Sequence, residues 1–349
     1  MRYVTQLPLH GGRAPRWLFG RMVKLGGLIS TVVIDEFGVD EYLERLCDPG
    51  WFQALSCAIG YDWHSSGTTT VTMGALREAL GGSSEIFIAG GKGKAGINTP
   101  NDIRSGVDNL SISQEERPFV EFSRLAAKID GTMVYDDIGI YHHSFIFTKN
   151  RKWGVVQQAM DYKSSNAIRF QWFSDRVNMK DVAGEPHSGI ETDMRKVTID
   201  LTDGRNHWAR SASVEILEDI NSIHVNSYPA RHGIVPDIDV GKRGWEAIRK
   251  ASELEPKDYR ELLLTKGVGR STLRSLALIS SLVYDKELAS RDPITYAYNL
   301  GGKDGIPFVI NRGTYDNVVD ELKHAVDAAN MESGEKYKAL KRLNAALAR

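Results

Sequence analysis

The chain has 349 residues, of which 42% are hydrophobic and 26% are charged, and its formal net charge is −1. This composition indicates a globular protein of two or three domains. Two cysteines, Cys47 and Cys57, exclude a disulfide framework and a zinc site built on cysteine, and they predict buried thiols in a reducing compartment. Because the net charge is near zero, any binding of nucleic acid must depend on local basic patches.

The N-terminal segment predicts neither a signal peptide nor a membrane span. It begins MRYVTQLPLHGG, which lacks the apolar core of a signal peptide. No stretch of the chain approaches about 18 consecutive apolar residues, the length that a membrane-spanning helix needs. We therefore predict a cytoplasmic protein with no membrane partner. The sequence allows a homodimer but does not establish one.

Residues 1–105 have the pattern of a compact α/β segment. The elements predicted up to residue 128 are helices over 17–28, 40–46, 68–80 and 113–128, a turn or helix at 100–103, and a short strand over 85–89. The strand ends in the glycine-rich run GGKGK at 90–94, which we expect to be a flexible cationic loop. That run is not a Walker A loop, because GxxxxGK[ST] is absent.

Residues 132–173 change to alternating β-branched and aromatic residues, which predicts an antiparallel meander of strands. Lys149–Asn150–Arg151 is the predicted turn of one hairpin, and AIRFQWF at 167–173 is the last strand of the meander. Residues 197–204 then predict a strand and a turn, and residues 209–221 predict a helix.

Beyond Pro236 the periodicity becomes helical. The predicted helices cover 244–254, 256–264, 270–284, 318–331 and 336–348. The fold class is therefore α+β, in which an N-terminal and central α/β region with an antiparallel strand meander precedes an all-helical C-terminal domain. We place the first domain at 1–235, with possible subdomains 1–130 and 131–235, and the helical domain at 240–349.

Residues 256–284 have the pattern of a helix-hairpin-helix, an element that grips a nucleic-acid backbone. Two helices flank Lys266–Gly267–Val268–Gly269, whose glycines permit a tight turn and close approach to another surface. The first amides of the second helix can point at one phosphate, which the helix dipole also favours. Residues 241–275 carry nine Lys or Arg against five Asp or Glu. The predicted DNA contacts here are Lys266, Gly267, Gly269, Arg270, Ser271 and Thr272. A hairpin used only for packing is the alternative.

The hairpin also resembles that of helix-hairpin-helix DNA glycosylases. In that family an Asp follows the hairpin by one helix and a short link, and Asp292 stands some three residues beyond the usual spacing. Ser271 occupies the place where bifunctional members carry a catalytic Lys, which argues against a Schiff-base lyase mechanism. Asp292 precedes Pro293, so a turn or a helix cap is the alternative role.

Two polar clusters lie in the N-terminal segment. Residues 62–69 combine His64 and Ser66 with other hydroxyls before a predicted helix, where a phosphate or an activated nucleophile could lie. A helix cap is the alternative, because Ser and Thr are preferred there. The GGKGK run offers Lys92 and Lys94 to a phosphate, and a solvated surface loop is its alternative.

A third cluster lies on the predicted strands. It consists of Asp136, Asp137, His142, His143, Gln157, Gln158 and Asp161. Strand neighbours face opposite sides, so only one of each adjacent His and Gln pair can share a pocket. Pairing of 140–147 with 153–160 would bring a His and a Gln together. With Asp137, His142 and His143 as ligands, Mn²⁺ or a transition metal would fit better than Mg²⁺. A polar sheet face with a hydrogen-bonded histidine is the alternative.

Several motifs together carry a family resemblance. They are LPLHGGRAPRWLFGRM (7–22), DWHSSGTT (62–69), GGKGK (90–94), YHHSFIF and WGVVQQAM within 141–160, EPH (185–187), KGVGRSTLRSLALIS (266–280) and GGKDGIPF (301–308). They resemble the archaeal and bacterial family called domain of unknown function 763, over nearly the whole chain. The resemblance implies a hairpin near the C-terminus and hence DNA transactions, without an assigned chemistry.

We therefore predict a DNA-binding and DNA-processing protein, with a nuclease that cleaves phosphodiester bonds in DNA repair or related DNA metabolism as the first hypothesis. The candidate catalytic residues are His64, Ser66, Asp137, His142, His143 and Gln158. Lys92, Lys94 and Lys303 are further candidate contacts to single- or double-stranded DNA, and Mg²⁺ or Mn²⁺ is the candidate cofactor. The alternatives are a glycosylase-like base-excision enzyme that uses Asp292 and a non-enzymatic DNA-binding protein.

Overall fold

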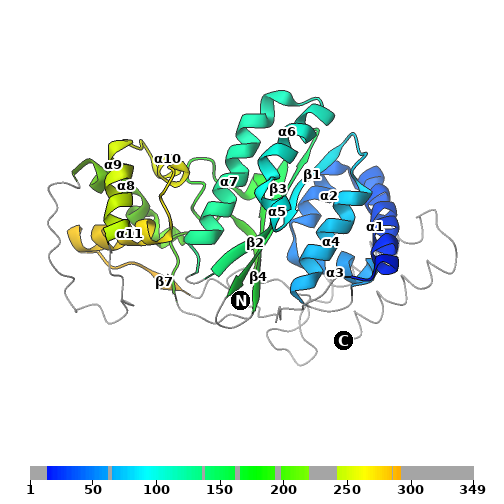
Figure 1. Cartoon of the computed structure of the whole chain (residues 1–349), viewed down its shortest axis with the longest axis horizontal. Helices are drawn as coiled ribbons and strands as arrows, with labels where there is room; N and C mark the ends of the chain where they lie inside the picture. Colours follow the sequence, from blue (N-terminus) through cyan, green and yellow to red (C-terminus); the bar gives the residue numbers. More distant parts are fainter. Residues whose placement is uncertain are drawn as a thin grey trace.

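The computed structural model describes residues 14–61, 65–135, 138–161, 166–192, 198–219, 242–284 and 286–291. In this part of the chain a five-stranded antiparallel sheet lies between helices on both of its faces, and a separate group of helices lies beyond one of these helical layers (Figure 1). The predicted α+β class, with a strand meander followed by helices, is confirmed.

The sheet is a meander in which every neighbouring pair of strands is antiparallel. Its strands, in both chain order and sheet order, are β1 (Ile86–Lys92), β2 (Ile138–Thr148), β3 (Trp153–Asp161), β4 (Ala167–Phe173) and β5 (His187–Glu191). The predicted hairpin turn joins β2 to β3, where the Arg151 amide donates to the Thr148 carbonyl at 3.0 Å. Arg151 has a φ of +68°, so the turn includes a residue in the left-handed region.

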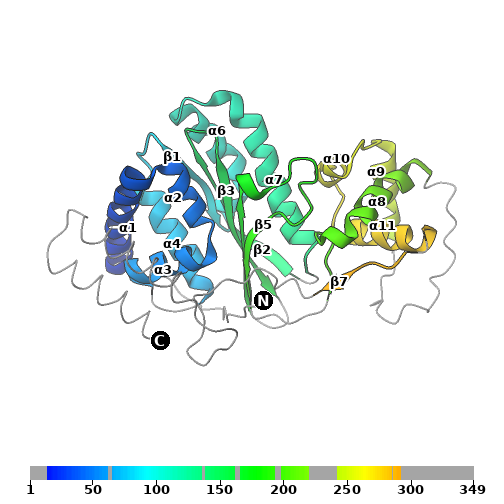
Figure 2. The same cartoon turned by 180° about the vertical axis from the view of Figure 1, so that it is seen from behind.

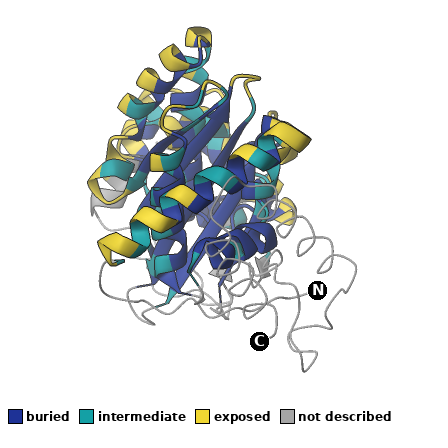
Figure 3. Ribbon diagram, turned by 90° about the vertical axis from the view of Figure 1, so that its right-hand side faces the viewer, coloured by how far each residue is buried: buried dark blue, intermediate teal, exposed yellow. Residues whose placement is uncertain are grey.

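Four helices cover one face of the sheet. They are α1 (Arg16–Phe37), α2 (Val39–Leu46), α3 (Pro49–Ile59) and α4 (Ser66–Ala79). Their apolar sides pack on Ile88, Ile146 and Val156, which project from β1, β2 and β3. Figure 3 shows the strands buried along almost their whole length, while the helices keep exposed residues on their outer sides.

Helix α3 is not among the predicted elements. Ten of its eleven residues are buried, so it lacks the alternation of apolar and polar positions that an amphipathic helix shows. Its start does carry a local signal, because Asp48 accepts a hydrogen bond from the Trp51 amide at 2.8 Å and Pro49 occupies the first helical position.

The opposite face of the sheet is covered by α5 (Lys94–Ile97), α6 (Thr99–Asn109) and α7 (Glu116–Thr132), of which Figure 2 shows α6 and α7 from behind. Aromatic rings dominate this layer. Phe119 of α7 lies with its ring centroid 5.7 Å from that of Phe145, and Phe145 stacks on Trp153 at 5.6 Å. Such ring pairs add to the area that the layer buries.

A second group of helices continues the core of this layer. It consists of α8 (His207–Asp219), α9 (Lys242–Glu253), α10 (Tyr259–Leu264) and α11 (Arg270–Val283), with a small ribbon formed by β6 (Thr198–Ile199) and β7 (Ser290–Arg291). Short 3-10 turns occur at Ser113–Glu115, Ser174–Arg176 and Gly204–Asn206. Helix α8 packs against α9 and α11, so the helical group begins upstream of the predicted boundary near 236–240, which lies outside the described residues.

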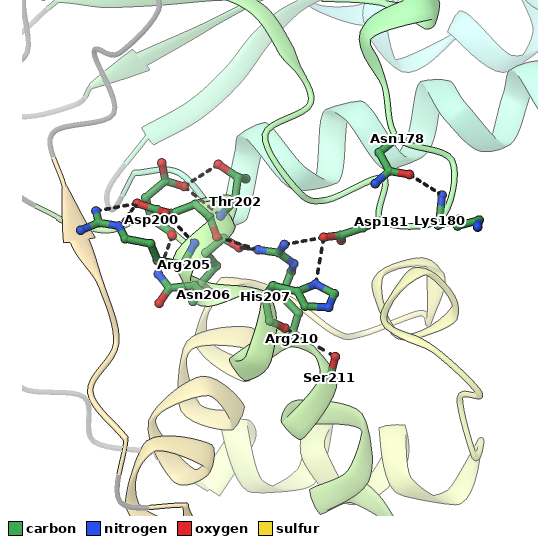
Figure 4. Close-up of polar contacts among 12 residues, drawn as sticks. Asn178, Lys180, Asp181, Asp200, Thr202, Arg205, Asn206, His207, Arg210 and Ser211 are labelled. Atoms are coloured by element: carbon green, nitrogen blue, oxygen red, sulfur yellow. Dashed lines mark hydrogen bonds and ion pairs between the residues drawn. The ribbon is translucent and has the colours of Figure 1, made fainter.

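A buried arginine joins this helical group to the chain that leaves the sheet (Figure 4). Arg210 of α8 is 2% exposed, and its guanidinium donates to the carbonyls of Leu201 at 2.7 Å and Asp203 at 3.0 Å. It also pairs with the Asp181 carboxylate at 2.5 Å, which accepts a further bond from His207. Because one cation holds three segments, its removal would leave several buried oxygens without a donor.

Helix α1 is long and apolar enough, by length and composition, to be a candidate membrane span. Arg21 and Lys24 interrupt its apolar sequence, so it contains no uninterrupted apolar run that would predict a membrane span. Met22, Ile29 and Val33 on its inner side are buried against the other helices of its layer. The inner side of α1 thus contributes to the core of the layer that it forms with α2–α4.

The GGKGK run differs from its prediction. Gly90, Gly91 and Lys92 belong to strand β1, and the helical turn α5 begins at Lys94, so the run is not a flexible loop. Gly90 has a φ of +87°, and a Cβ there would lie 2.3 Å from the carbonyl oxygen of His143. Close approach of two strands therefore explains this glycine. The predicted helices at 318–331 and 336–348 lie outside the described residues.

Candidate functional site

One row of polar residues crosses the whole sheet on the face that α1–α4 cover. In register order from β1 to β5, the row consists of Lys92, His142, Gln158, Arg169 and Glu191. Lys92 is exposed on the edge strand, and the other four side chains are buried. Three of the predicted site residues thus lie side by side, and Arg169 and Glu191 extend the row in a way that the sequence analysis missed.

Gln158 uses both ends of its amide inside the protein. Its oxygen accepts from the Thr69 hydroxyl, and its nitrogen donates to the Ser66 carbonyl at 2.9 Å and to the Tyr141 hydroxyl. Ser66 is the first residue of α4, so these contacts attach the start of the helix to strands β2 and β3. Both ends of the buried Gln158 amide are thus engaged inside the protein, which indicates a structural role.

His142 is the member of the row with an unused atom. Its Nε2 bonds to the Ser144 hydroxyl at 3.0 Å, while its Nδ1 is buried and has no partner among the described residues. Burial, together with smaller contributions from the nearby His143 and Lys92, lowers the pKa of His142 to about 3. The ring is therefore neutral at physiological pH.

Arg169 and Glu191 close the row as a buried ion pair. The Arg169 guanidinium also lies over the Phe52 ring, 4.7 Å from its centroid. Burial lowers the pKa of Arg169 to about 9, and the Asp48 charge opposes that shift. A buried cation that has a carboxylate and a ring as partners fastens β4, β5 and α3 together.

His143 lies on the opposite face of the sheet, in a second polar network. Its Nδ1 bonds to the Gln157 side-chain oxygen at 2.8 Å, and its Nε2 bonds to the Ser123 hydroxyl at 2.9 Å. The predicted approach of a His and a Gln across these strands is confirmed. The Gln157 nitrogen donates to the Ala126 carbonyl at 3.0 Å and to the Asp130 carboxylate, so its oxygen is the acceptor for His143.

These contacts determine the positions of the protons. Because Gln157 accepts at its oxygen, the proton of the neutral His143 ring lies on Nδ1, and Nε2 accepts from Ser123. Burial lowers the pKa of His143, which keeps the ring neutral. Asp130 also accepts from Trp172 at 2.9 Å and bonds to His187 Nε2 at 2.6 Å. This network uses all of its members internally and resembles the satisfied polar core of a stable protein.

The positions of the two histidines on opposite faces of the sheet separate two of the predicted metal ligands. His142 and His143 belong to separate networks on opposite sides of the sheet, so the two imidazoles cannot bind one ion. Asp137, the third predicted ligand, lies outside the described residues, as do His64, Asp292 and Lys303. Within the residues that the structure covers, no group of three or more His, Cys, Asp or Glu could hold a metal ion.

The predicted hairpin region forms two helices joined by a glycine turn. Helix α10 begins after Asp258, which accepts from the Glu261 amide at 2.8 Å, and α11 follows the turn Thr265–Gly269. Val268 is 2% exposed and packs in the core, while Lys266, Gly267 and Ser271 are exposed. The apolar residue thus anchors the turn, and its polar and glycine positions remain accessible.

Two predicted DNA contacts of this region face the protein instead. Arg270 donates to the carbonyls of Gly131 at 2.6 Å and Ile138 at 2.7 Å, so it joins the start of α11 to the end of α7 and the start of β2. Thr272 is 2% exposed. One guanidinium nitrogen of Arg270 and the Thr272 side chain thus contribute to packing, and the DNA contacts predicted for these two residues stay predictions.

The two turn glycines have different reasons to be glycine. Gly267 has a φ of +95°, a conformation that strains residues with a Cβ. Gly269 has a φ of −130°, which any residue adopts, and a Cβ there would meet no atom within 4 Å. Gly269 is the N-cap of α11, where glycine is tolerated well, but neither its φ nor packing within the described residues requires a glycine there.

The chain belongs to the family described as protein of unknown function (DUF763), whose model matches residues 3–310. The match extends from the N-terminal segment through the sheet and the glycine turn. No curated protein and no solved structure matches the chain.

Proposed function

We propose that this protein binds the sugar–phosphate backbone of DNA through the glycine turn between α10 and α11. The observation that carries this proposal is Gly269, whose φ is ordinary and whose Cβ would meet no atom of the described residues within 4 Å. Without a side chain at position 269, a ligand can come close to the backbone of the turn. A phosphate would suit the free amides at the start of α11. The exposed Lys266 supplies a cation beside the same turn.

Phosphate contacts of this kind hold a backbone without reading its bases. The proposal therefore predicts little sequence preference and a strong dependence of affinity on salt, because binding releases counterions. It accommodates single- or double-stranded DNA. A cytoplasmic location is part of the proposal, and the two buried free thiols, Cys47 and Cys57, are compatible with a reducing compartment.

A pair of glycine variants tests the proposal. Fluorescence anisotropy with labelled single- and double-stranded DNA would compare the wild-type protein, Gly269→Val and Gly82→Val over a salt series. Gly82 is a matched control, because it is exposed and its Cβ would also meet nothing within 4 Å. We expect Gly269→Val to lose about tenfold or more in affinity, which corresponds to about one charge-assisted hydrogen bond.

The control should bind like the wild type, and urea unfolding should find all three proteins equally stable. Equal DNA binding by a folded Gly269→Val protein would contradict the proposal. The same result would favour a hairpin used only for packing.

Phosphodiester hydrolysis is the second candidate function, and the observation in its favour is His142. Its buried Nδ1 has no partner in the part of the chain that the structure describes, and the exposed Lys92 lies beside His142 in register. Incubation of labelled DNA with Mg²⁺, Mn²⁺ or a chelator tests this function by strand cleavage. Cleavage that His142→Asn abolishes, with DNA binding retained, would support it. Abasic-site formation on damaged DNA would instead favour the glycosylase hypothesis with Asp292.

A further inference from the structure

Two cations cross between α7 and the glycine turn in opposite directions. Lys128 of α7 donates from Nζ to the carbonyl oxygen of Val268, inside the turn. Arg270 of α11 donates back to the carbonyls of Gly131 and Ile138. These contacts hold the turn in a fixed orientation relative to the sheet.

The Lys128 contact acts on one peptide group, the link between Val268 and Gly269. In a trans peptide the C=O and the N–H point in opposite directions. Because Lys128 draws the Val268 carbonyl toward α7, the amide proton of Gly269 points away from α7. That amide belongs to the residue whose Cβ position is open.

The Lys128 charge also affects the strength of that amide as a donor. A cation bonded to a carbonyl draws electron density through the peptide, so the N–H on its other side becomes a better donor. Lys128 is half-buried, and burial lowers its pKa, which is the direction expected where water screens the charge poorly. Weak screening strengthens its effect on the neighbouring peptide.

We propose that Lys128 is a positioning residue for phosphate binding, which orients and polarises the Val268–Gly269 peptide so that the Gly269 amide donates to a backbone phosphate. This inference rests on the proposed function, and it adds a residue that does not itself touch the DNA. The alternative is that Lys128 only docks the helical group on α7, or that it contributes a general positive charge.

A binding comparison distinguishes these roles. We would measure DNA affinity for the wild type, Lys128→Met, Lys128→Arg and Lys250→Met, where Lys250 is an exposed lysine of α9 and controls for the loss of one charge. We expect Lys128→Met to lose about tenfold, Lys250→Met to lose no more than about twofold, and Lys128→Arg to recover most of the affinity.

A double-mutant cycle then connects Lys128 to Gly269. In a Gly269→Ala background, where the methyl group blocks the phosphate, Lys128→Met should cost no further affinity. Additive losses, or wild-type binding by Lys128→Met, would overturn the inference and leave a docking role. If Lys128→Met does not fold by circular dichroism, Lys128→Gln takes its place, since it keeps a donor and removes the charge.

A spectroscopic measurement without DNA separates this inference from the proposed function. In ¹⁵N-glycine-labelled protein, the Gly269 amide signal is the one missing from Gly269→Ala. It should shift in Lys128→Met, return toward its position in Lys128→Arg, and respond to inorganic phosphate more strongly in the wild type than in Lys128→Met. An unmoved signal in Lys128→Met refutes the inference, whereas a moved signal in a protein that binds no DNA refutes the proposed function alone.

Discussion

The network around His143 and the turn around Gly269 both contain residues that stand out in the sequence, yet they differ in what the fold does with them. Ser123, His143 and Gln157 satisfy one another, and Asp130 accepts from three donors. Gly269 is the N-cap of α11, and neither its φ nor its neighbours among the described residues require a glycine. Polar residues whose hydrogen bonds are satisfied inside the protein need no ligand. A residue such as Gly269, whose identity the fold does not require, is a better candidate for contact with a ligand.

The largest effect that we expect from this comparison is at Asp130. It is fully buried and accepts from Trp172, His187 and Gln157. Asp130→Ala would leave these donors unsatisfied in a dry environment, so the free energy of unfolding should fall by about 4 kcal/mol or more. Urea denaturation measures the change. An unchanged or increased stability would mean that the network around His143 is a strained functional site and not a satisfied polar core.

The next effect is a pH dependence of stability that comes from His142. Its pKa is about 3 in the folded protein and about 6.5 in an unfolded chain. Between these values the unfolded state binds a proton that the folded state does not, so stability falls as the pH falls from about 6.5 to about 3. Each unit of pKa difference corresponds to about 1.4 kcal/mol, which gives a loss of a few kcal/mol.

Urea unfolding at a series of pH values would measure this loss. His142→Gln removes the titrating ring and should flatten the profile over the same window, apart from the share that His143 contributes. If the stability of the wild type depends on pH no more steeply than that of His142→Gln, then His142 is not a neutral, buried residue.

Substitutions at the two turn glycines should have effects of intermediate size on stability. Gly267→Ala places a Cβ at a φ of +95°, so it should destabilise the protein by about 1–2 kcal/mol. Gly269→Ala should change stability by less than about 1 kcal/mol, because alanine loses less conformational freedom on folding but is less favourable than glycine at the N-cap of α11. Thermal unfolding of both variants checks this order. A large loss of stability in Gly269→Ala would provide a structural reason for that glycine and weaken the proposed DNA contact.

The smallest effect that we expect is at an exposed ion pair. Arg104 and Glu116 lie 2.8 Å apart, and their side chains are 52% and 45% exposed. Arg104→Ala should change the free energy of unfolding by less than about 1 kcal/mol. Arg104→Ala is a reference for Asp130→Ala, since both substitutions remove a charged hydrogen-bonding partner and the two sites differ mainly in burial. A loss as large as that of Asp130→Ala would mean that burial does not control these contacts.

Local patterns predicted several strands and helices well. The alternating run AIRFQWF coincides with β4, which spans Ala167–Phe173, and the predicted helix over 270–284 nearly coincides with α11. Elements without a one-sided pattern were missed. Helix α3 is buried almost all round, and β5 (His187–Glu191) is too short to show an alternation. Periodicity measures the contrast between an apolar and a polar face, so it fails where a segment is apolar on all sides or too short to show the contrast.

The sequence by itself determined that His142 and His143 face opposite sides of their strand, because side chains alternate along any β-strand. It also identified a glycine turn between two helices, since glycine tolerates the φ of Gly267. Tertiary structure alone decided which partners these residues meet. The row from Lys92 to Glu191 depends on the register of five strands, and the contact of Lys128 with Val268 joins residues 140 positions apart in the chain. Such pairings arise from packing between distant segments, and no local pattern encodes them.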